Sequence, residues 1–434
     1  MPAGTVLLTL PGALQLGVGS AYKRSESDGT ARGEAGRSVL LDATPAAMRS
    51  LRLGIALWSE IKRGAESPFG PYLDLLPKTL SCCLAPGYTT EASEALKAWP
   101  PTAARVAAMR AALRAQHAKL LRAAAVASVE EAPTLDELGW ASAIAGSRAY
   151  RVRGSRGQAG DSACLLPIID LANYAPSVQA NAELRNAPTG EVLGASADPL
   201  AVSLCASRDL PAGTEVLIDY GSGTPLTNER LLLEYGFVLP PDSGSSDSLE
   251  LPLGAIAIGM QALAAAEDEA SAVGAADGGA GAAEATTSEG DRILLLRQQQ
   301  LLAELGDIEH AGLVFAADGA PNEATHALAL ILAARRSGDL PPNLSASDLV
   351  ASARAWTAPK EAAAGELAMR ARRALHAVVR VALEELLAGA SAGAAAGEAA
   401  QAAAGFEAAA RDFCETRRVI LERACERLSS ASLK

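Results

Sequence analysis

Hydrophobic residues in the first third of the chain recur at helical spacing. Met48, Leu51 and Ile55 lie three or four residues apart, which places them on one face of an amphipathic helix. The alanine-rich stretch at 102–127 predicts a long helix, because alanine has the highest intrinsic helix propensity. We therefore expect helices to fill most of residues 44–150.

Two threonines are suited to begin helices in this region. Thr44 precedes Pro45, and these residue types favour the N-cap and the first helical position. Thr134 precedes Glu137 by three residues, which is the spacing of a capping box. We expect one helix to be capped by Thr44 and another by Thr134.

Short apolar runs bounded by turn residues indicate strands outside the helical region. The tetrapeptide Pro-Ala-Gly-Thr occurs at 2–5 and again at 211–214, each time directly before a strand-like run. Further apolar runs follow Cys164 and flank the turn-forming residues at 186–190. Two copies of one turn and strand predict a sheet that is assembled from segments distant in the sequence.

The composition changes after Phe237. Residues 264–291 contain seven acidic residues and no basic one among many alanines and glycines, a composition that does not supply a packed core. Hydrophobic residues then recur at helical spacing to the end of the chain. We predict an α+β domain at 1–240 with a helical insert at about 44–150, a linker or disordered loop at 241–291, and an all-helical domain at 292–434.

Charge and cysteine content exclude some classes of function. The net charge is −12 and the pI is about 5.0, so we expect no nonspecific nucleic-acid binding, which needs a basic surface. The six cysteines include no Cys-x-x-Cys pair, so neither a metal site nor a disulfide scaffold is indicated. The sequence contains no run of about 18 uncharged apolar residues, so it predicts no membrane span.

Polar and aromatic side chains are concentrated in one otherwise apolar stretch, at 165–237. Asn173 and Asn181 follow the apolar run that contains Asp170, and Tyr220 ends another such run. Buried amides need hydrogen-bond partners, because an unpaired one costs roughly 1 to 3 kcal/mol. Each of these residues taken singly fits a turn or a strand end, whereas their order within one stretch favours a ligand site.

Three motifs lie in and before this stretch. The first is Trp140-Ala-Ser-Ala-Ile-Ala-Gly-Ser-Arg148-Ala-Tyr150. The second is Leu166-Pro-Ile-Ile-Asp170-Leu-Ala-Asn173-Tyr174, followed by Asn181-Ala182. The third runs from Tyr220-Gly221 through Thr227-Asn-Glu-Arg-Leu-Leu-Leu-Glu-Tyr235-Gly-Phe237.

The motifs and their order resemble those of the SET-domain methyltransferases, in the subclass with the architecture of the Rubisco large-subunit methyltransferase (LSMT). The resemblance extends along the chain, and the C-terminal helices are similar to the Rubisco LSMT substrate-binding domain. It implies a SET domain of short β-sheets with a helical insert, followed by an all-α domain. In this family a pseudoknot brings together the segments that correspond to Asn173 and Tyr220.

The resemblance implies a reaction as well as a fold. Members of the family transfer a methyl group from S-adenosyl-L-methionine to the side-chain nitrogen of a lysine in a protein substrate. Tyr220 corresponds to the catalytic tyrosine. Together with Tyr235 and Phe237, it corresponds to the wall of the channel that admits the lysine.

The resemblance implies that the cofactor binds to residues of the first two motifs and of the end of the third. Arg148 is expected to contact the cofactor's carboxylate, Asn173 its amine, and the backbone around Tyr174 its adenine. The corresponding positions are Arg148, Asp170, Asn173, Tyr174, Tyr235 and Phe237. No metal ion is implied.

The sequence differs from the family pattern at two places. The Gly-x-Gly strand that supports the methionine end of the cofactor is expected ahead of Pro2, outside the printed chain. Tyr174 stands where the family usually has histidine. Two alternatives to a lysine methyltransferase therefore stay open: a non-catalytic protein-binding module derived from a SET domain, and a histidine-directed methyltransferase of the same subclass.

The expected partner is a protein that presents a lysine, with no nucleic acid and no membrane. We expect a soluble, intracellular monomer. The compartment is not indicated by the sequence, and both chloroplast and cytoplasm are compatible with the resemblance.

Overall fold

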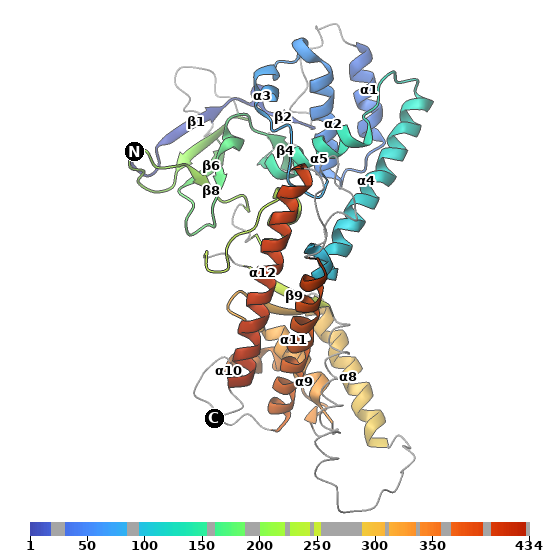
Figure 1. Ribbon diagram of the computed structural model, residues 1–434, viewed down its shortest axis with the longest axis vertical. Helices are drawn as coiled ribbons and strands as arrows, with labels where there is room; N and C mark the ends of the chain where they lie inside the picture. Colours follow the sequence, from blue (N-terminus) through green and yellow to red (C-terminus); the bar gives the residue numbers. More distant parts are fainter. Residues whose placement is uncertain are drawn as a thin grey trace, which may run out of the picture. The chain divides into compact units, whose positions relative to one another are not determined.

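The computed structural model divides the protein into two compact units. It describes residues 1–18, 31–84, 95–153, 161–186, 200–221, 226–243, 247–252, 289–308, 312–335, 339–356, 366–393 and 401–430. The first unit comprises Met1–Leu96, Thr102–Ser245 and Ala396–Phe413. The second comprises Lys97–Pro101, Ser246–Ala395 and Cys414–Lys434. Figure 1 shows the order of the elements along the chain.

The helices of the first unit precede most of its strands. They are α1 (Ala31–Asp42), α2 (Arg49–Lys62), α3 (Gly70–Leu75), most of α4 (Pro100–Val126), α5 (Leu135–Arg148) and α6 (Asn228–Arg230). The first part of α12 (Gln401–Ser430) also belongs to this unit. The predicted long helix at 102–127 is confirmed as α4. The capping box is also confirmed, because the Thr134 side chain accepts from the Glu137 backbone and the Glu137 side chain accepts from the Thr134 backbone.

The prediction that Thr44 caps a helix is wrong. The helix begins at Arg49, with Met48 at its N-cap and no side-chain capping bond. Thr44 is buried, and its hydroxyl donates to the carbonyl of Leu40 in α1 at 2.9 Å. The threonine therefore belongs to the end of the preceding helix, because tertiary burial there supplies the partner for its hydroxyl.

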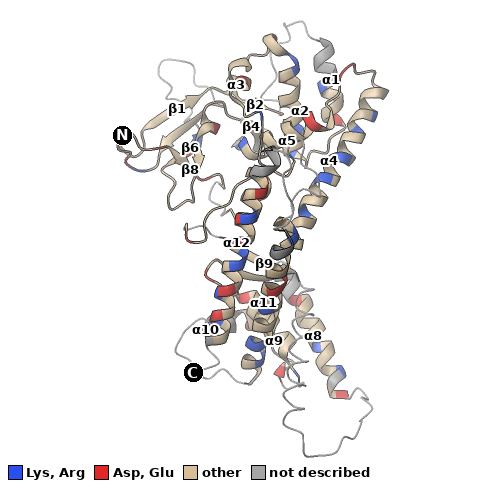
Figure 2. Cartoon of the chain, viewed as in Figure 1, with Lys and Arg blue, Asp and Glu red and all other residues tan. Residues whose placement is uncertain are grey.

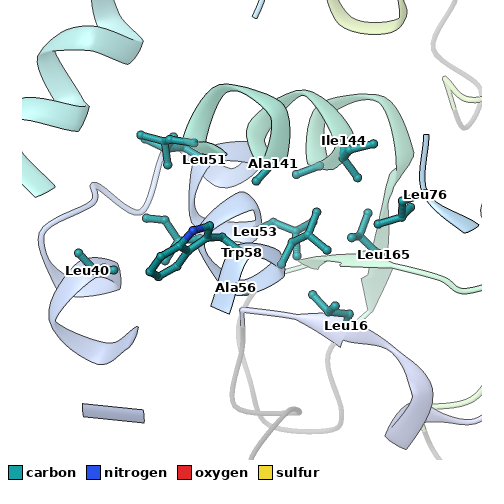
Figure 3. Packing of buried hydrophobic residues seen from close by; sticks show 14 of the residues in the cluster. Leu16, Leu40, Leu51, Leu53, Ala56, Trp58, Leu76, Ala141, Ile144 and Leu165 are labelled. Atoms are coloured by element: carbon teal, nitrogen blue, oxygen red, sulfur yellow. The ribbon is translucent and has the colours of Figure 1, made fainter. Parts of the chain in front are cut away.

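Helices α2 and α5 pack directly on each other and form the centre of the helical core. Leu53 of α2 and Ile144 of α5 are completely buried, and their side chains extend into the same cluster (Figure 3). A Cβ on Gly54 would lie 2.9 Å from the Ser142 backbone nitrogen, so the close approach of the two helices requires glycine. This packing positions Arg148, the last residue of α5.

A five-stranded sheet joins segments from both ends of the first unit, as the repeated Pro-Ala-Gly-Thr predicted. Its strand order is β1-β7-β6-β8-β5. The strands are β1 (Val6–Leu10), β5 (Asn173–Tyr174), β6 (Ala182–Asn186), β7 (Val202–Ala206) and β8 (Leu217–Ile218). Both copies of the tetrapeptide form the same turn, with Gly4 at φ 81° and Gly213 at φ 82°.

A second sheet in this unit has the order β2-β4-β3. Its strands are β2 (Leu16–Gly17), β3 (Ala149–Arg153) and β4 (Asp161–Leu165). Strand β3 follows α5 without a break, so the two-residue step from Arg148 to Tyr150 carries the chain from helix into sheet. The predicted turn at 186–190 lies mostly outside the described residues.

The second unit is mainly helical. Its helices are α8 (Glu289–Ile308), α9 (Glu323–Ala333), α10 (Ala346–Trp356), α11 (Glu366–Gly393) and part of α12 (Gln401–Ser430). It also contains an antiparallel pair, β9 (Ser248–Pro252) and β10 (Gly312–Ala316). The sequence pattern predicted helices at 292–434 and did not predict β10. A strand forms there because it pairs with β9, which lies in the segment expected to be a linker. The last residues of the predicted linker, 289–291, belong to α8, and its residues 253–288 lie outside the described residues.

Charged residues are unevenly distributed among the elements. Helix α4 carries several Lys and Arg side chains and no acidic residue (Figure 2). Within the first unit Arg105 of α4 pairs with Glu229. In the second unit, Arg417 and Asp247 form an ion pair at 2.5 Å with both side chains buried. Among the described helices, none is both long enough and apolar enough to cross a membrane.

Candidate active site

Four aromatic side chains meet beside the five-stranded sheet. The ring of Tyr220 lies 5.3 Å from that of Tyr174 and 5.1 Å from that of Tyr235, between centroids. Phe237 lies 5.9 Å from Tyr174 and 6.2 Å from Tyr235. We call these four residues the aromatic cluster. Its tilted and stacked rings present electron-rich faces, which attract cations.

Strand pairing brings the first two members of the cluster together. Strands β5 and β8 are parallel, with Tyr174 opposite Ile218, and Tyr220 follows β8 by two residues. Residues two apart in an extended segment point to the same side. The two residue pairs that join β5 and β8 therefore bring Tyr174 close to Tyr220, which lies 46 positions later in the sequence.

A sharp change of backbone direction brings in the other two members. Tyr235 ends the π-helical turn η6 (Leu231–Tyr235), and Gly236 follows in the left-handed conformation at φ 79°. A Cβ at Gly236 would lie only 1.8 Å from the carbonyl oxygen of Ser81. Only glycine fits this reversal, which places Tyr235 and Phe237 against the same neighbours.

The hydroxyl of Tyr220 is held in a defined direction. It donates to the carbonyl oxygen of Ala172 at 2.8 Å, and Ala172 directly precedes β5. Burial raises the pKa of Tyr220 above its ordinary value of 10.0. The phenol is therefore protonated at neutral pH and acts as a hydrogen-bonding group rather than as a base.

Arg148 and Asp170 form the polar side of the site. The Arg148 Nη1 donates to the Asp170 carbonyl oxygen at 3.0 Å and lies 3.7 Å from the Asp170 Oδ2. The same Oδ2 accepts from the hydroxyl of Tyr72 at 2.6 Å. Burial raises the pKa of Asp170, against the lowering effect of Tyr72 and Arg148. The other carboxylate oxygen, Oδ1, is buried and has no hydrogen-bond partner among the described residues.

The two predicted asparagines occupy different environments. Asn181 is buried, donates to the Glu215 carbonyl oxygen at 2.9 Å and accepts from the Leu217 backbone at 2.9 Å. Asn173 is exposed and donates to the Glu215 carboxylate at 2.6 Å. Successive residues of a strand point to opposite faces, so Tyr174 rather than Asn173 directs its side chain toward Tyr220.

No protein-family model matches this chain. "SET domain-containing protein 4" of Mus musculus is 31% identical over 195 residues, which make up 43% of this chain and 41% of the mouse protein. The match thus spans less than half of that relative's length.

Solved structures match over the whole chain. The SET domain of LSMT bound to lysine and AdoHcy aligns with a TM-score of 0.59, at 16% identity, over 100% of this chain and 83% of that one. Rubisco LSMT bound to AdoMet gives 0.58 at 15%, and the same protein bound to sinefungin and monomethyllysine gives 0.60 at 17%. Each of these two alignments covers 100% of this chain and 84% of the other. The chain has the SET-domain fold of the LSMT type.

Within this SET-type fold, sequence reasoning missed three residues near the predicted site. Tyr72 contacts Asp170 from α3, 98 residues earlier in the chain. Tyr150, which follows Arg148 in the first motif, is half-buried, and burial and the nearby Tyr220 raise its pKa. Glu215 accepts hydrogen bonds from both Asn173 and Asn181. Only Tyr150 had a detectable signal, because it lies inside a motif that was already singled out.

The SET-type fold also contains a strained residue at the edge of the site. Ile168 adopts φ 71° and ψ −44° immediately before the 3-10 turn η5 (Ile169–Leu171). A β-branched residue at positive φ is a genuine outlier, and such strain persists only where the surroundings impose it. Here it redirects the chain so that Asp170 turns inward toward Tyr72.

Proposed function

We propose that this protein transfers a methyl group from S-adenosyl-L-methionine to the side-chain nitrogen of a lysine in a protein substrate. The observation that carries the proposal is the aromatic cluster around Tyr220, with the buried Asp170 and its partner Arg148 beside it. The alignment with LSMT structures bound to lysine, monomethyllysine and AdoHcy supports it.

The residues present fit a cofactor of this kind. The Asp170 Oδ1 is a buried acceptor to which no residue in the described part of the chain donates, which suits an amine or another cationic group. Arg148 offers a guanidinium to a carboxylate, and Asn173 and the Tyr174 backbone lie at the adjoining strand. When bound, the cofactor supplies an electrophilic methyl group that needs no metal. The protein's contribution is to position the reactants, which can supply ~7 to 11 kcal/mol.

The aromatic cluster fits a lysine side chain. Tyr220, Tyr235 and Phe237 offer apolar contact to the methylene groups of such a side chain. Desolvation by such a wall lowers the pKa of a lysine from its free value of ~10.4. A larger fraction of the amine is then neutral and nucleophilic. We assign Tyr220 as the catalytic residue, with its hydroxyl orienting the amine.

Methyl transfer to proteins tests the proposal directly. The protein is incubated with radiolabelled S-adenosyl-L-methionine and a protein extract, and labelled products are digested and mapped by mass spectrometry. We expect label on lysine. Label on histidine alone would show that the acceptor is histidine and not lysine. Binding of extract proteins without methyl transfer would favour a non-catalytic binding module.

The matched pair of variants is Tyr220→Phe and Thr9→Val. Each removes one hydroxyl from the region of the five-stranded sheet. Within the described ranges the Thr9 hydroxyl bonds only that of Ser203 in the neighbouring strand, at 2.8 Å. We expect Tyr220→Phe to lower turnover by roughly 100-fold, in line with the loss of a positioned hydrogen-bonding group. Thr9→Val is expected to retain wild-type turnover. Equal activity of the two variants contradicts the role of Tyr220.

A further inference from the structure

Tyr72 is a buried polar residue that the proposed reaction does not use. It lies in α3, is 6% exposed, and donates its hydroxyl to the Asp170 Oδ2 at 2.6 Å. The Asp170 carboxylate is fully buried, so its charge depends on the groups around it. A hydrogen bond to a charged group in such a place stabilises more than one between neutral groups.

The bond from Tyr72 is the outer part of a chain of contacts that reaches the candidate site. Asp170 in turn faces Arg148, which lies 3.7 Å from its Oδ2 and donates to its carbonyl oxygen. Two residues further on, Ala172 accepts from Tyr220. The segment that leads into Asn173 and Tyr174 is thus held by contacts from α3, from α5 and from Tyr220, two residues beyond β8.

We propose that Tyr72 is a positioning residue for cofactor binding, which acts by holding the Asp170 carboxylate toward Arg148. The inference rests on the proposed function. Tyr72 touches neither the aromatic cluster nor Arg148 through a hydrogen bond; its hydroxyl reaches the site through Asp170. Without that hydroxyl, Asp170 loses a donor and the guanidinium loses a fixed, charged partner.

The charge on Asp170 gives the proposal a distinctive readout. The carboxyl faces Tyr72 from α3, Arg148 from α5, Tyr150 from β3 and Tyr220 beyond β8. Burial raises its pKa, whereas the bonds from Tyr72 and Arg148 lower it. Removing the Tyr72 hydroxyl therefore raises the pKa of Asp170, and the neutral acid appears at higher pH.

The test compares Tyr72→Phe with a matched control in the same stretch of chain. Ser67 donates to the buried carboxylate of Glu60 at 2.8 Å, so Ser67→Ala also removes a hydroxyl bonded to a buried carboxylate but leaves Asp170 untouched. Binding of S-adenosyl-L-homocysteine is measured by calorimetry on the full chain between pH 5 and 8. Thermal unfolding is recorded for each variant.

We expect Tyr72→Phe to weaken binding at neutral pH by roughly tenfold or more, the equivalent of the lost hydrogen bond. The pH at which binding falls to half should also move upward, because the neutral acid forms at a higher pH once the Tyr72 hydroxyl is removed. Ser67→Ala should keep the wild-type affinity and pH profile even where its unfolding temperature falls. In an Asp170→Asn background, Tyr72→Phe should no longer shift the profile.

Two results overturn the proposal and are distinguishable. If the wild-type protein binds S-adenosyl-L-homocysteine and Tyr72→Phe has the affinity and pH profile of Ser67→Ala, the positioning role is refuted while the proposed function stands. If the wild-type protein binds no S-adenosyl compound, the proposed function fails and the positioning role fails with it. The Asp170 carboxyl can also be titrated by NMR in the ligand-free protein. This titration supports the positioning role of Tyr72 only if Tyr72→Phe raises the pKa of Asp170.

Discussion

The ring of Tyr174 lies against the ring of Tyr220, with their centroids 5.3 Å apart. This contact exists because two short parallel strands, β5 and β8, pair residue for residue next to it. It places a tyrosine, at a position where the resembled family usually has histidine, within the aromatic cluster. The Tyr174 side chain is thus part of the aromatic cluster, where it contacts both Tyr220 and Phe237.

Tyr174→Ala is predicted to lower both stability and transfer. Tyr174 packs against Tyr220 and Phe237, and each aromatic contact contributes about 0.5 to 1.5 kcal/mol beyond area burial. We expect the free energy of unfolding in urea to fall by about 1 to 3 kcal/mol. Tyr174→Phe is the control, because the hydroxyl makes no hydrogen bond to the described residues. A loss as large in Tyr174→Phe contradicts ring packing as the cause.

The two asparagines should respond differently to truncation. Asn181→Ala leaves the Glu215 carbonyl and the Leu217 amide without their buried partner, and we expect a loss of about 2 to 4 kcal/mol in unfolding free energy. Asn173→Ala removes an exposed bond to the Glu215 side chain, and its unfolding free energy should change by less than about 1 kcal/mol. Asn173→Ala should instead weaken binding of S-adenosyl-L-homocysteine. Equal stability losses in urea contradict this division of roles.

Glycine is required at position 236 by space as well as by conformation. Gly236 and Gly213 have nearly equal φ angles of 79° and 82°. A Cβ at 236 would lie 1.8 Å from the Ser81 carbonyl oxygen, whereas at 213 nothing lies within 4 Å. We expect Gly213→Ala to cost about 1 to 2 kcal/mol, the strain of the left-handed backbone, and Gly236→Ala to cost more than about 3 kcal/mol. Chemical denaturation of both variants measures the difference.

His326 in α9 should make the stability of the second unit depend on pH. Burial lowers the pKa of His326 to about 4, and Arg372 adds to the effect. The unfolded state, with an ordinary pKa near 6.5, therefore binds the proton first. The stabilisation is complete above about pH 6.5 and is lost as the pH falls toward 4, to a total of roughly 3 kcal/mol. Urea unfolding at several pH values measures it.

The control for this pH dependence is His326→Gln. Carboxylates also titrate below pH 5, so the relevant quantity is the difference between the wild-type and variant curves. That difference should decrease as the pH falls from 6.5. If the difference between the two unfolding free energies is constant with pH, the loss of stability at low pH comes from groups other than His326.

Local patterns in the sequence were sufficient where the interacting residues are close in the chain. The capping box of Thr134 and Glu137 formed as predicted, since both its bonds lie within one helical turn. The two Pro-Ala-Gly-Thr turns formed alike, because each glycine satisfies its own backbone requirement. The motif order also predicted the SET-type fold, to which the solved LSMT structures align.

Only the tertiary structure decided which polar groups are paired and which are buried. It gave Thr44 a partner in the preceding helix and gave Asp170 a partner in Tyr72, 98 residues away. It also formed β10 by supplying β9 as its pairing partner. Hydrogen bonds and burial between distant segments have no period in the sequence, so spacing could indicate the motifs but could not determine their contacts.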